Sequence, residues 1–471
     1  MALVAGVDSS TQSCKVLICD SATGAIVRSG SARHPDGTEV DPAFWWEALS
    51  EAIHAAGGID DVEAISVAAQ QHGLVALDAT GQVIRPSLLW NDTRSAEAAL
   101  DLIAEYGAEN FVNNTGSLPV ASFTITKLRW LKDHEPHHAA RVAAVCLPHD
   151  WLTWRLRGYG PANESIHGPQ LDQLTTDRSD ASGTGYFNPV TNDYIPELIE
   201  LALGHVPLLP RVLGPNEIAG TTPDGVVVAA GAGDNAGAAL GLNAREGDAV
   251  ISIGTSGTAF AVTKLPAHDA SGSVAGFADA SGNYLPLVAT LNAARVVDAT
   301  ARVLGLDFES FAESALSANE GSDGLVLVPY FEGERTPNLP QANASLHGMT
   351  LANYTPANVA RAALEGMLSG LADGLEAVTS TSGAVSRILL VGGGAQSPAT
   401  QQIASTVFTV PVEVPTPGEY VAMGAAVQAQ WALSGERPNW EINISARFPS
   451  AHNPVISQQY RRYQAEVARN S

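Results

Sequence analysis

Asp234 is the residue whose surroundings point most directly to chemistry. It lies in the string GAGDNAG (residues 231–237), after a predicted strand at 226–230 and before a predicted helix of small residues. The small neighbours leave space for a ligand to reach the carboxylate, which could accept a proton from a substrate hydroxyl during group transfer. Aspartate is also a frequent helix N-cap, and the local pattern alone favours that role. The sequence therefore leaves a general base and a helix cap as alternatives.

Three turns have the composition of phosphate-binding loops. The first is DSSTQSCK (Asp8–Lys15), in which hydroxyl side chains lie beside a carboxylate at the end of a strand. Hydroxyls and turn amides can hold phosphate oxygens, and a carboxylate can hold Mg²⁺, often through water. The others are GTSG (Gly254–Gly257) and GGG (Gly392–Gly394), where backbone amides favour a nucleotide. Each alone is better explained as an ordinary turn, but three in one chain, two of them in similar hairpins, favour phosphate binding.

Polar side chains follow two further predicted strands. Gln71 and His72 come after the apolar strand at 64–68, and Asn91 and Asp92 lie in the string WNDTR. Amide, imidazole and carboxylate groups at strand ends commonly form sites for small polyhydroxylated ligands. The alternatives are a core histidine with satisfied hydrogen bonds for His72 and a helix cap for Asn91 and Asp92.

The elements that would position these side chains alternate between strand and helix. Apolar runs at 2–8 and 15–19 flank the first phosphate-like turn, and runs at 249–254 and 259–262 flank the second in the same way. This repeat of strand, hydroxyl turn and strand predicts an internal duplication of one domain type. A strand at 387–391 enters the triple-glycine turn, which precedes a helix. The mixture predicts an α/β protein.

Composition excludes several classes of protein. The chain has 471 residues, 45% of them hydrophobic, so it can bury cores in two or more domains. Its 25 basic and 49 acidic residues give a net charge of −24, which disfavours nucleic acid and anionic membranes as partners. No lysine follows a glycine, which excludes a P-loop, and three cysteines without a CxxC pair exclude a disulfide framework or zinc ribbon. Without a basic leader or a long apolar run, a cytoplasmic protein is expected.

Together the motifs resemble those of the FGGY carbohydrate kinases, which belong to the actin/hexokinase/Hsp70-like ATPase superfamily. The strings follow the family's order along essentially the whole chain. GVDSSTQSCKV resembles the first phosphate motif, GAGDNAG the catalytic-aspartate motif and SIGTSG the second phosphate motif. The remaining matches are SFTITKLRWLKDH (122–134), TDRSDASGTGYF (176–187), PYFEGERTPN (329–338) and VGGGAQS (391–397).

The resemblance implies two ribonuclease-H-like domains with an interdomain cleft. The expected parts are a sugar-binding N-terminal domain (1–244), a nucleotide-binding C-terminal domain (245–439) and a C-terminal extension (440–471). Asp234 would be the general base for attack of a sugar hydroxyl on the γ-phosphoryl of ATP, and Asp8 would anchor Mg²⁺ directly or through water. The residues implied to bind the sugar are Gln71, His72, Asn91, Asp92, Asp234 and Asn235. Those implied to bind the nucleotide are Asp8, Thr11, Lys15, Gly254, Thr255, Gly257, Gly392, Gly393, Gly394 and Ser397.

Three strings indicate a branch within the family. AAQQHGLVALD (68–78), RPSLLWNDTR (85–94) and LPHDWLTWRLRG (147–158) are most similar to the members that convert D-xylulose to D-xylulose 5-phosphate. Two departures concern sugar preference: Gln71 stands where that branch commonly has methionine, and Ser10 where the family commonly has glycine. The alternatives are a family kinase for another ketose, a polyol or an aldonate, and a non-catalytic ATP-binding regulator of the superfamily. A small sugar and ATP are the expected partners, and a homodimer stays open.

Overall fold

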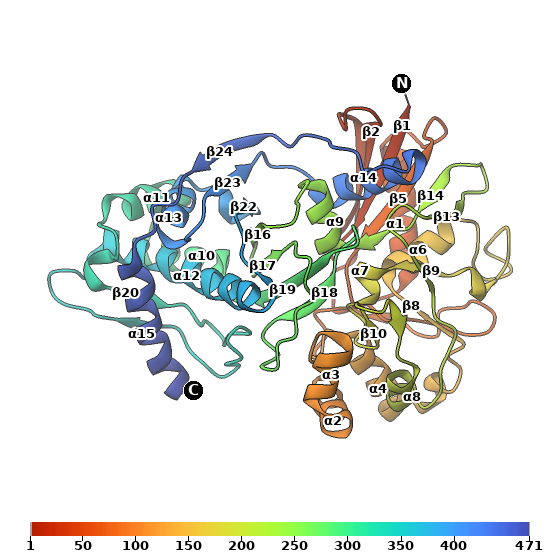
Figure 1. The fold of residues 1–471 in the computed structure, drawn as a ribbon, viewed down its shortest axis with the longest axis horizontal. Helices are drawn as coiled ribbons and strands as arrows, with labels where there is room; N and C mark the ends of the chain where they lie inside the picture. Colours follow the sequence, from red (N-terminus) through yellow and green to blue (C-terminus); the bar gives the residue numbers. More distant parts are fainter. Residues whose placement is uncertain (1, 471) are drawn as a thin grey trace.

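Two sheets, one in each half of the chain, form the framework of the molecule (Figure 1). The computed structural model describes residues 2–470. The first sheet has the strand order β13-β14-β5-β1-β2-β3, and β15 also pairs with β5. Its strands are β1 (Leu3–Ser9), β2 (Ser13–Asp20), β3 (Ile26–Arg33), β5 (Ala64–Ala69), β13 (Ile218–Thr221), β14 (Val227–Ala229) and β15 (Ala232–Gly233).

The second sheet repeats the pairing of the first. Its order is β18-β19-β17-β16-β22-β23-β24. In each sheet the leading strand pairs antiparallel with the next strand and parallel with a later one: β1 with β2 and β5, and β16 with β17 and β22. The predicted internal duplication is therefore present. The strands are β16 (Asp248–Ile253), β17 (Gly257–Ala261), β18 (Ala275–Ala278), β19 (Tyr284–Thr290), β22 (Arg387–Val391), β23 (Val412–Pro415) and β24 (Ile444–Phe448).

The helices on these sheets begin where the sequence provides a cap. Asp41 accepts a hydrogen bond from the Ala43 amide at the start of α1 (Pro42–Ala55), and proline occupies the first helical position. Thr355 caps α12 (Pro356–Ser382) in the same way. The apolar side of α1 packs against β2 and β3, whereas α12 packs against β17 and β19. Each sheet thus has its own covering helix.

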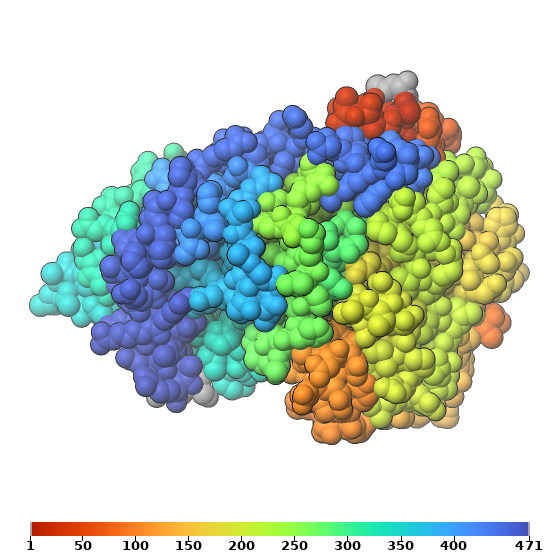
Figure 2. All heavy atoms as spheres, viewed as in Figure 1, coloured from red at the N-terminus to blue at the C-terminus, as the bar shows by residue number. Residues whose placement is uncertain are grey.

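One helix near the C-terminus, α14 (Tyr420–Ser434), lies on the first sheet although its sequence belongs to the second half. It packs against β1, β5 and α9 (Asp234–Gly241), as Figure 1 shows. Glycine permits this close approach, because a Cβ on Gly6 of β1 would overlap the carbonyl oxygen of Ala422. A side chain on Gly424 would overlap the α9 backbone. The C-terminal segments, blue in Figure 2, accordingly extend over both halves.

Trp440 still packs against the first sheet, and the residues from β24 onward join the second half. β24 pairs antiparallel with β23, and α15 (Pro454–Asn470) packs against α12 and β20 (Val326–Val328). The predicted boundaries at 244 and 439 stay predictions. At Val83-Ile84 no strand forms, and Val83 makes a single isolated bridge to Leu77.

The other elements are mostly short. No helix within residues 2–470 is both long and apolar enough to cross a membrane. The remaining helices are α2 (Ala96–Tyr106), α3 (Ala108–Thr115), α4 (Thr124–His134), α5 (Pro136–Ala139), α6 (Pro148–Leu156), α7 (Arg178–Ala181), α8 (Pro196–Leu203), α10 (Ala294–Leu304), α11 (Phe308–Ser317) and α13 (Pro398–Val407), with 3₁₀ turns at Leu171–Gln173, Ser322–Gly324 and Gly393–Gln396. The remaining strands are β4 (Glu39–Val40), β6 (Val75–Leu77), β7 (Ser87–Leu88), β8 (Ala144–Cys146), β9 (Thr175–Asp177), β10 (Phe187–Asn188), β11 (Asp193–Tyr194), β12 (Arg211–Leu213) and β21 (Ser345–His347).

Candidate active site

The ends of three neighbouring strands bring the acidic and polar candidates of the first sheet together. β1 and β5 run parallel with Asp8 opposite Ala68, and β15 pairs with β5 so that Gly233 lies opposite Ala69. The chain leaves β5 into Gln71 and His72, and it leaves β15 into Asp234. Parallel strands end at one edge of a sheet, where ligands of α/β proteins bind. The register therefore places these candidates at that edge.

Asp234 is the first residue of α9, and the helix N-cap is Gly233. The capping alternative is therefore wrong. One carboxylate oxygen, Oδ1, accepts hydrogen bonds from the Asn235 amide at 2.7 Å and from Asn235 Nδ2 at 2.9 Å. Burial, together with the negative charge of nearby Asp8, raises the pKa of Asp234 to about 7 against the hydrogen bonds from Asn235. A partly exposed carboxylate with a pKa near neutrality suits a general base.

Asp8 is a buried carboxylate in the first phosphate-like turn, with 4% of its surface exposed. Burial raises its pKa to about 6, although the Ser10 hydroxyl donates a hydrogen bond to it. The hydroxyl of Ser9 is buried without a hydrogen-bond partner. The Thr11 hydroxyl accepts a hydrogen bond from Trp90 Nε1 at 2.8 Å, and Lys15 pairs with Glu419, the residue before α14, at 2.6 Å. Trp90 and Glu419, which lie outside the hairpin, thus hold the side chains of this turn in place.

His72 occupies a strained backbone position that its neighbours stabilise. Its φ is +72°, which is rare for a residue with a Cβ. Thr124 Oγ1 and the ammonium group of Lys127 donate to its carbonyl oxygen at 3.1 and 3.0 Å. Lys127 is fully buried, and burial lowers its pKa to about 7. Lys127 lies in the family string at 122–134, but the sequence predicted no role for it. A lysine among the buried positions of a helix is the signal that could have identified it.

The imidazole of His72 packs in one cluster with aromatic rings from both halves of the molecule. It stacks on Phe123 with ring centroids 4.8 Å apart, and Phe277 of β18 lies 5.7 Å away. Burial and the charge of Lys127 lower its pKa to about 3, so the ring is neutral. Nδ1 lies 2.6 Å from the carbonyl oxygen of Gly183, so it carries the proton. Nε2 is then an acceptor, which can receive a hydrogen bond from a ligand hydroxyl.

Gln71 supports the turn before Asp234. Its side-chain amide donates to the carbonyl oxygen of Ser179 at 2.8 Å, and the hydroxyl of Ser179 accepts a hydrogen bond from the Gly233 amide at 3.1 Å. The Gln71 amide nitrogen is therefore engaged with the protein. Ser179 of α7 therefore links Gln71 by hydrogen bonds to Gly233, the residue before Asp234.

Asn91 and Asp92 differ in how far their polar atoms are satisfied. Asp92 is buried and accepts from Thr38 Oγ1 at 2.8 Å and from the backbone amide and Nε of Arg94 at 3.0 and 2.9 Å. Burial alone would raise its pKa, but these hydrogen bonds and the Arg94 charge hold it below the ordinary value. The side-chain oxygen of Asn91, in contrast, is buried without a partner. Asn91 is thus the member of the pair with a free acceptor.

The nucleotide candidates of the second sheet also lie together. β16 and β22 run parallel with Ser252 opposite Val391, so the turn at Gly254–Ser256 and the glycines after β22 are neighbours. A Cβ on Gly392 would lie 2.6 Å from the Ile253 carbonyl oxygen. Gly254, Thr255, Gly392 and Gly393 are exposed, Gly394 is partly exposed, Gly257 is buried, and Ser397 is the N-cap position of α13 with no hydrogen bond from its side chain. This edge is open and lined by glycine, as a nucleotide site requires.

His149 forms a buried charge cluster beneath these strand ends that the sequence analysis did not assign. Its Nδ1 lies 2.5 Å from Asp180 and 3.3 Å from Asp150, and its Nε2 lies 3.3 Å from the carbonyl oxygen of Ala230. Burial opposes charging the ring, but the two carboxylates raise its pKa to about 10. Because both ring nitrogens face acceptors, the imidazolium form fits, and His149 offers no free nitrogen to a metal.

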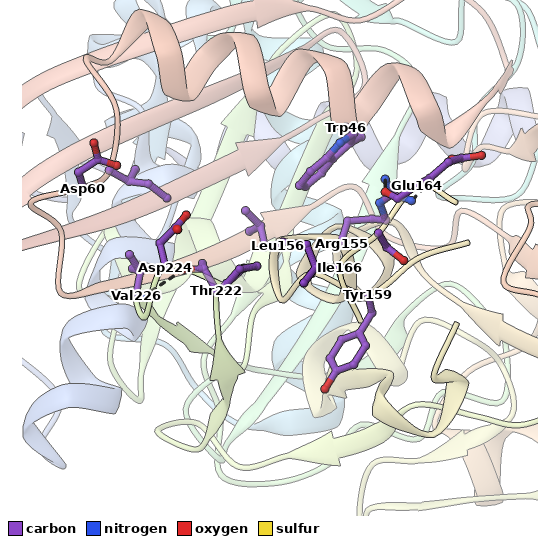
Figure 3. A pocket seen from close by; sticks show the side chains of 14 residues that line it. Trp46, Asp60, Arg155, Leu156, Tyr159, Glu164, Ile166, Thr222, Asp224 and Val226 are labelled. Carbon is purple, nitrogen blue, oxygen red and sulfur yellow. Dashed lines mark hydrogen bonds and ion pairs between the residues drawn. The ribbon is translucent and has the colours of Figure 1, made fainter. Parts of the chain in front are cut away.

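A hollow of about 660 Å³ lies on a different part of the first half, where none of the predicted site residues lines it. Figure 3 shows Trp46 above Arg155, with Thr222 and Asp224 farther along the groove. The guanidinium of Arg155 lies 5.2 Å from the Trp46 ring centroid. The polar candidates therefore concentrate at the strand ends, away from this groove.

Comparison with known proteins identifies both halves of the chain. The FGGY family of carbohydrate kinases, N-terminal domain, matches residues 3–241, and its C-terminal domain matches residues 249–433. The xylulose kinase of Streptomyces coelicolor is 45% identical over 96% of this chain and 92% of its own length. The crystal structure of xylulose kinase from Bifidobacterium adolescentis has a TM-score of 0.93 and 44% identity, covering 98% of this chain and 99% of its own. Plasmodium falciparum glycerol kinase with ADP shares the fold at a TM-score of 0.84 and 19% identity, covering 100% of this chain and 97% of its own.

Proposed function

The chain belongs to the FGGY family of carbohydrate kinases, and on that premise we propose that it phosphorylates D-xylulose at O5 to give D-xylulose 5-phosphate. The predicted two-domain α/β fold of the family is confirmed, and ATP is the phosphate donor of these enzymes. The observation that carries the proposed mechanism is Asp234: a partly exposed carboxylate at the meeting point of the strand ends, with a pKa raised to about 7. The named relatives over nearly the full length support the choice of xylulose.

Asp234 supplies the base of the proposed reaction. Its carboxylate accepts the proton of the sugar O5 hydroxyl as that oxygen forms a bond to the γ-phosphorus. The bond from the γ-phosphorus to the bridging oxygen breaks, and ADP leaves. Asn235 holds one oxygen of the carboxylate, so that the other can face the hydroxyl. Closure of the halves around both substrates would exclude water.

The first turn fits a magnesium ion brought by ATP. Asp8 provides a buried carboxylate, and the Ser9 hydroxyl beside it is buried without a partner. Mg²⁺ prefers oxygen ligands and commonly binds one or two carboxylates together with phosphates. Asp8 would therefore hold the ion, directly or through water. The bound ion would offset the charge of the phosphates.

The remaining predicted residues divide between the two substrates. His72 Nε2 and the unpartnered Asn91 oxygen would accept hydrogen bonds from sugar hydroxyls. Asp92 and Gln71 would mainly hold the surrounding backbone, because the Asp92 carboxylate and the Gln71 side-chain nitrogen already have protein partners. The phosphates would lie between the turns that contain Thr11, Lys15, Gly254, Thr255 and Gly257, and the nucleoside near Gly392, Gly393, Gly394 and Ser397.

The test is ADP release from MgATP with D-xylulose, L-ribulose, D-ribulose, glycerol, gluconate and several pentitols. We expect D-xylulose to give the highest kcat/KM, and Asp234→Asn to lower the sugar-dependent kcat about 10³-fold while the protein stays folded. A higher rate with another sugar would keep the chemistry and reject the substrate. If folded protein binds ATP but no sugar stimulates ADP release, the kinase proposal fails and the non-catalytic regulator is favoured.

A further inference from the structure

Arg335 belongs to a segment that a buried glutamate attaches to the second phosphate turn. Glu334 has 4% of its surface exposed, and its Oε1 accepts hydrogen bonds from the backbone amides of Leu291 and Arg335 at 2.6 and 2.8 Å. Its Oε2 accepts from Asn292 Nδ2 at 2.9 Å. Leu291 directly follows Thr290, the last residue of β19, which pairs with Gly257 in that turn. Glu334 thus fixes the backbone of Arg335 beside the nucleotide side of the site.

The guanidinium of Arg335 extends toward the first phosphate turn. It lies 5.9 Å from the ring centroid of Trp90, within the range of a cation–π contact. Trp90 Nε1 in turn donates to the hydroxyl of Thr11 at 2.8 Å. The backbone of Arg335 is therefore linked through Glu334 to the end of β19 beside one phosphate turn, while its guanidinium lies against Trp90, which is hydrogen-bonded to the other turn.

Three cations around the two turns are paired with carboxylates, whereas within residues 2–470 Arg335 and the exposed Arg33 of β3 are not. Lys15 pairs with Glu419, Arg94 with Asp92 and Glu39, and Arg295 with Glu332. Arg335 forms no ion pair within residues 2–470, and the carboxylate next to it is occupied by N–H groups. In a chain with a net charge of −24, an uncommitted guanidinium between two phosphate turns is a binding group for an anion.

We propose that Arg335 binds the γ-phosphoryl group of ATP between the two phosphate turns and stabilises its charge during transfer. This inference rests on the proposed function, because it takes the anion to be the transferring phosphoryl group. A guanidinium presents several N–H donors in a plane that matches phosphate oxygens. Where an arginine performs this role in other phosphoryl-transfer enzymes, it contributes about 10³–10⁵ in kcat. A cation–π contact at an exposed site is weak, so little free energy is lost when the guanidinium leaves Trp90 for a phosphate.

Variants of Arg335 separate the contribution of its positive charge from that of its planar guanidinium group. Arg335→Gln removes the cation, Arg335→Lys keeps it without the planar donors, and Arg447→Gln removes an exposed arginine of the same half that pairs with Glu413. We expect kcat to fall about 10²–10³-fold in Arg335→Gln, about tenfold in Arg335→Lys and less than twofold in Arg447→Gln. Added guanidinium chloride should restore part of the rate of Arg335→Gln only.

A binding measurement tests the contact without turnover. Calorimetry with the magnesium complexes of ADP and of the β,γ-imido analogue of ATP measures the preference for a γ-phosphate. We expect Arg335→Gln to reduce that preference at least tenfold, with unchanged ADP affinity. An unchanged preference together with a kcat within threefold of the parent protein would overturn the proposal.

Two outcomes keep this proposal apart from the proposed function. If the parent protein phosphorylates no sugar, the function fails, while the two nucleotide affinities still decide whether Arg335 contacts the γ-phosphate. If circular dichroism shows that Arg335→Gln is unfolded, Arg335→Lys decides: a preserved γ-phosphate preference and a rate equal to that of the parent protein would reject a role for the planar guanidinium.

Discussion

The turn after β1 and the turn after β16 occupy the same place in two sheets of the same pairing, but they are held very differently. In the first turn Asp8 is buried, Ser10 donates to it, and Trp90 and His34 contact Thr11 and the Ser10 carbonyl at 2.8 Å each. In the second turn Gly254, Thr255 and Ser256 are exposed, and the turn contains a single internal hydrogen bond of 3.1 Å.

The difference indicates that the two similar hairpins have different roles in the site. The first turn lies beside a second carboxylate, Asp234, and burial raises the pKa of both groups. The second turn lies beside the glycines after β22 and has no acidic residue of its own. We infer that the first hairpin is organised before substrates bind, for proton and metal chemistry, whereas the second is completed by the polyphosphate that it binds.

Replacement of Asp234 by asparagine should have the largest effect, because it removes the base while keeping the shape. A positioned general base contributes about 10²–10⁴ in rate, so we expect kcat to fall about 10³-fold. The control is Asp224→Asn in the distant groove, which should leave kcat unchanged. If the kcat of Asp234→Asn stays within tenfold of that of the parent protein, Asp234 is not the general base.

The same variant has a predicted effect on stability. Folding raises the pKa of Asp234 from an ordinary value of 3.8 to about 7, so between these values the folded protein binds the proton more tightly than the unfolded chain. The free energy of unfolding therefore falls as pH rises through that range, and the ionised group weakens folding at pH 8. Asp234→Asn should retain or raise the midpoint of thermal unfolding at pH 8, measured by calorimetry.

A matched pair of substitutions compares the two turns directly. Asp8→Asn should lower kcat about 10²-fold, because it removes the charge that we propose to anchor the metal. Thr255→Val should raise the KM for ATP about three- to tenfold with little change in kcat, as expected for loss of a neutral hydrogen bond of about 0.5–1.5 kcal/mol. Steady-state kinetics with varied MgATP measures both. Equal losses in kcat would contradict the division of roles between the turns.

The pH dependence of kcat/KM should report the ionisation of Asp234. Because the Asp234 carboxylate must be ionised to accept a proton, kcat/KM should fall about tenfold per pH unit below about 7 and level off above it. Lys127 titrates in the same range, since burial lowers its pKa to about 7. The profile of Lys127→Met should therefore be recorded as well. Disappearance of the inflection in that variant would assign it to the lysine.

Two adjacent glycines give the smallest and most local test. Gly392 has a φ of +94° and no room for a Cβ, so Gly392→Ala should lower the free energy of unfolding by about 1–3 kcal/mol. A Cβ on Gly393 would meet no atom within 4 Å, so Gly393→Ala should change the free energy of unfolding by less than about 0.5 kcal/mol. Chemical denaturation measures both. Equal stabilities would show that the glycine turn is not constrained by Ile253.

Features that depend on neighbours in the chain could be predicted from the sequence. The two strand–turn–strand hairpins and the strand at 387–391 follow from short apolar runs that lead into turns of small or polar residues. The same local signals favoured a helix cap over a general base for Asp234, but Gly233 occupies the cap position without a side-chain bond. Site assignments beyond local chemistry came from the resemblance, and the individual residue roles stay predictions.

Features that depend on distant pairings could not be predicted. Nothing in the string around His72 indicates that Phe277, some 200 residues later, lies beside its ring, or that Lys127 holds its carbonyl. Arg335 was visible only as one residue of a family string, because its relation to Trp90 exists only in the folded chain. Such contacts join segments whose separation carries no sequence signal.

The position of α14 on the first sheet has a consequence for synthesis of the protein. The face of β1 and β5 that α14 covers is apolar and cannot be buried until residues 420–434 have left the ribosome. About 190 residues separate the end of α9 from the end of α14. At roughly 5–20 residues per second, the nascent first half waits about 10–40 s with that face uncovered. We therefore expect the N-terminal half to expose an apolar face during translation and, expressed alone, to be prone to aggregate.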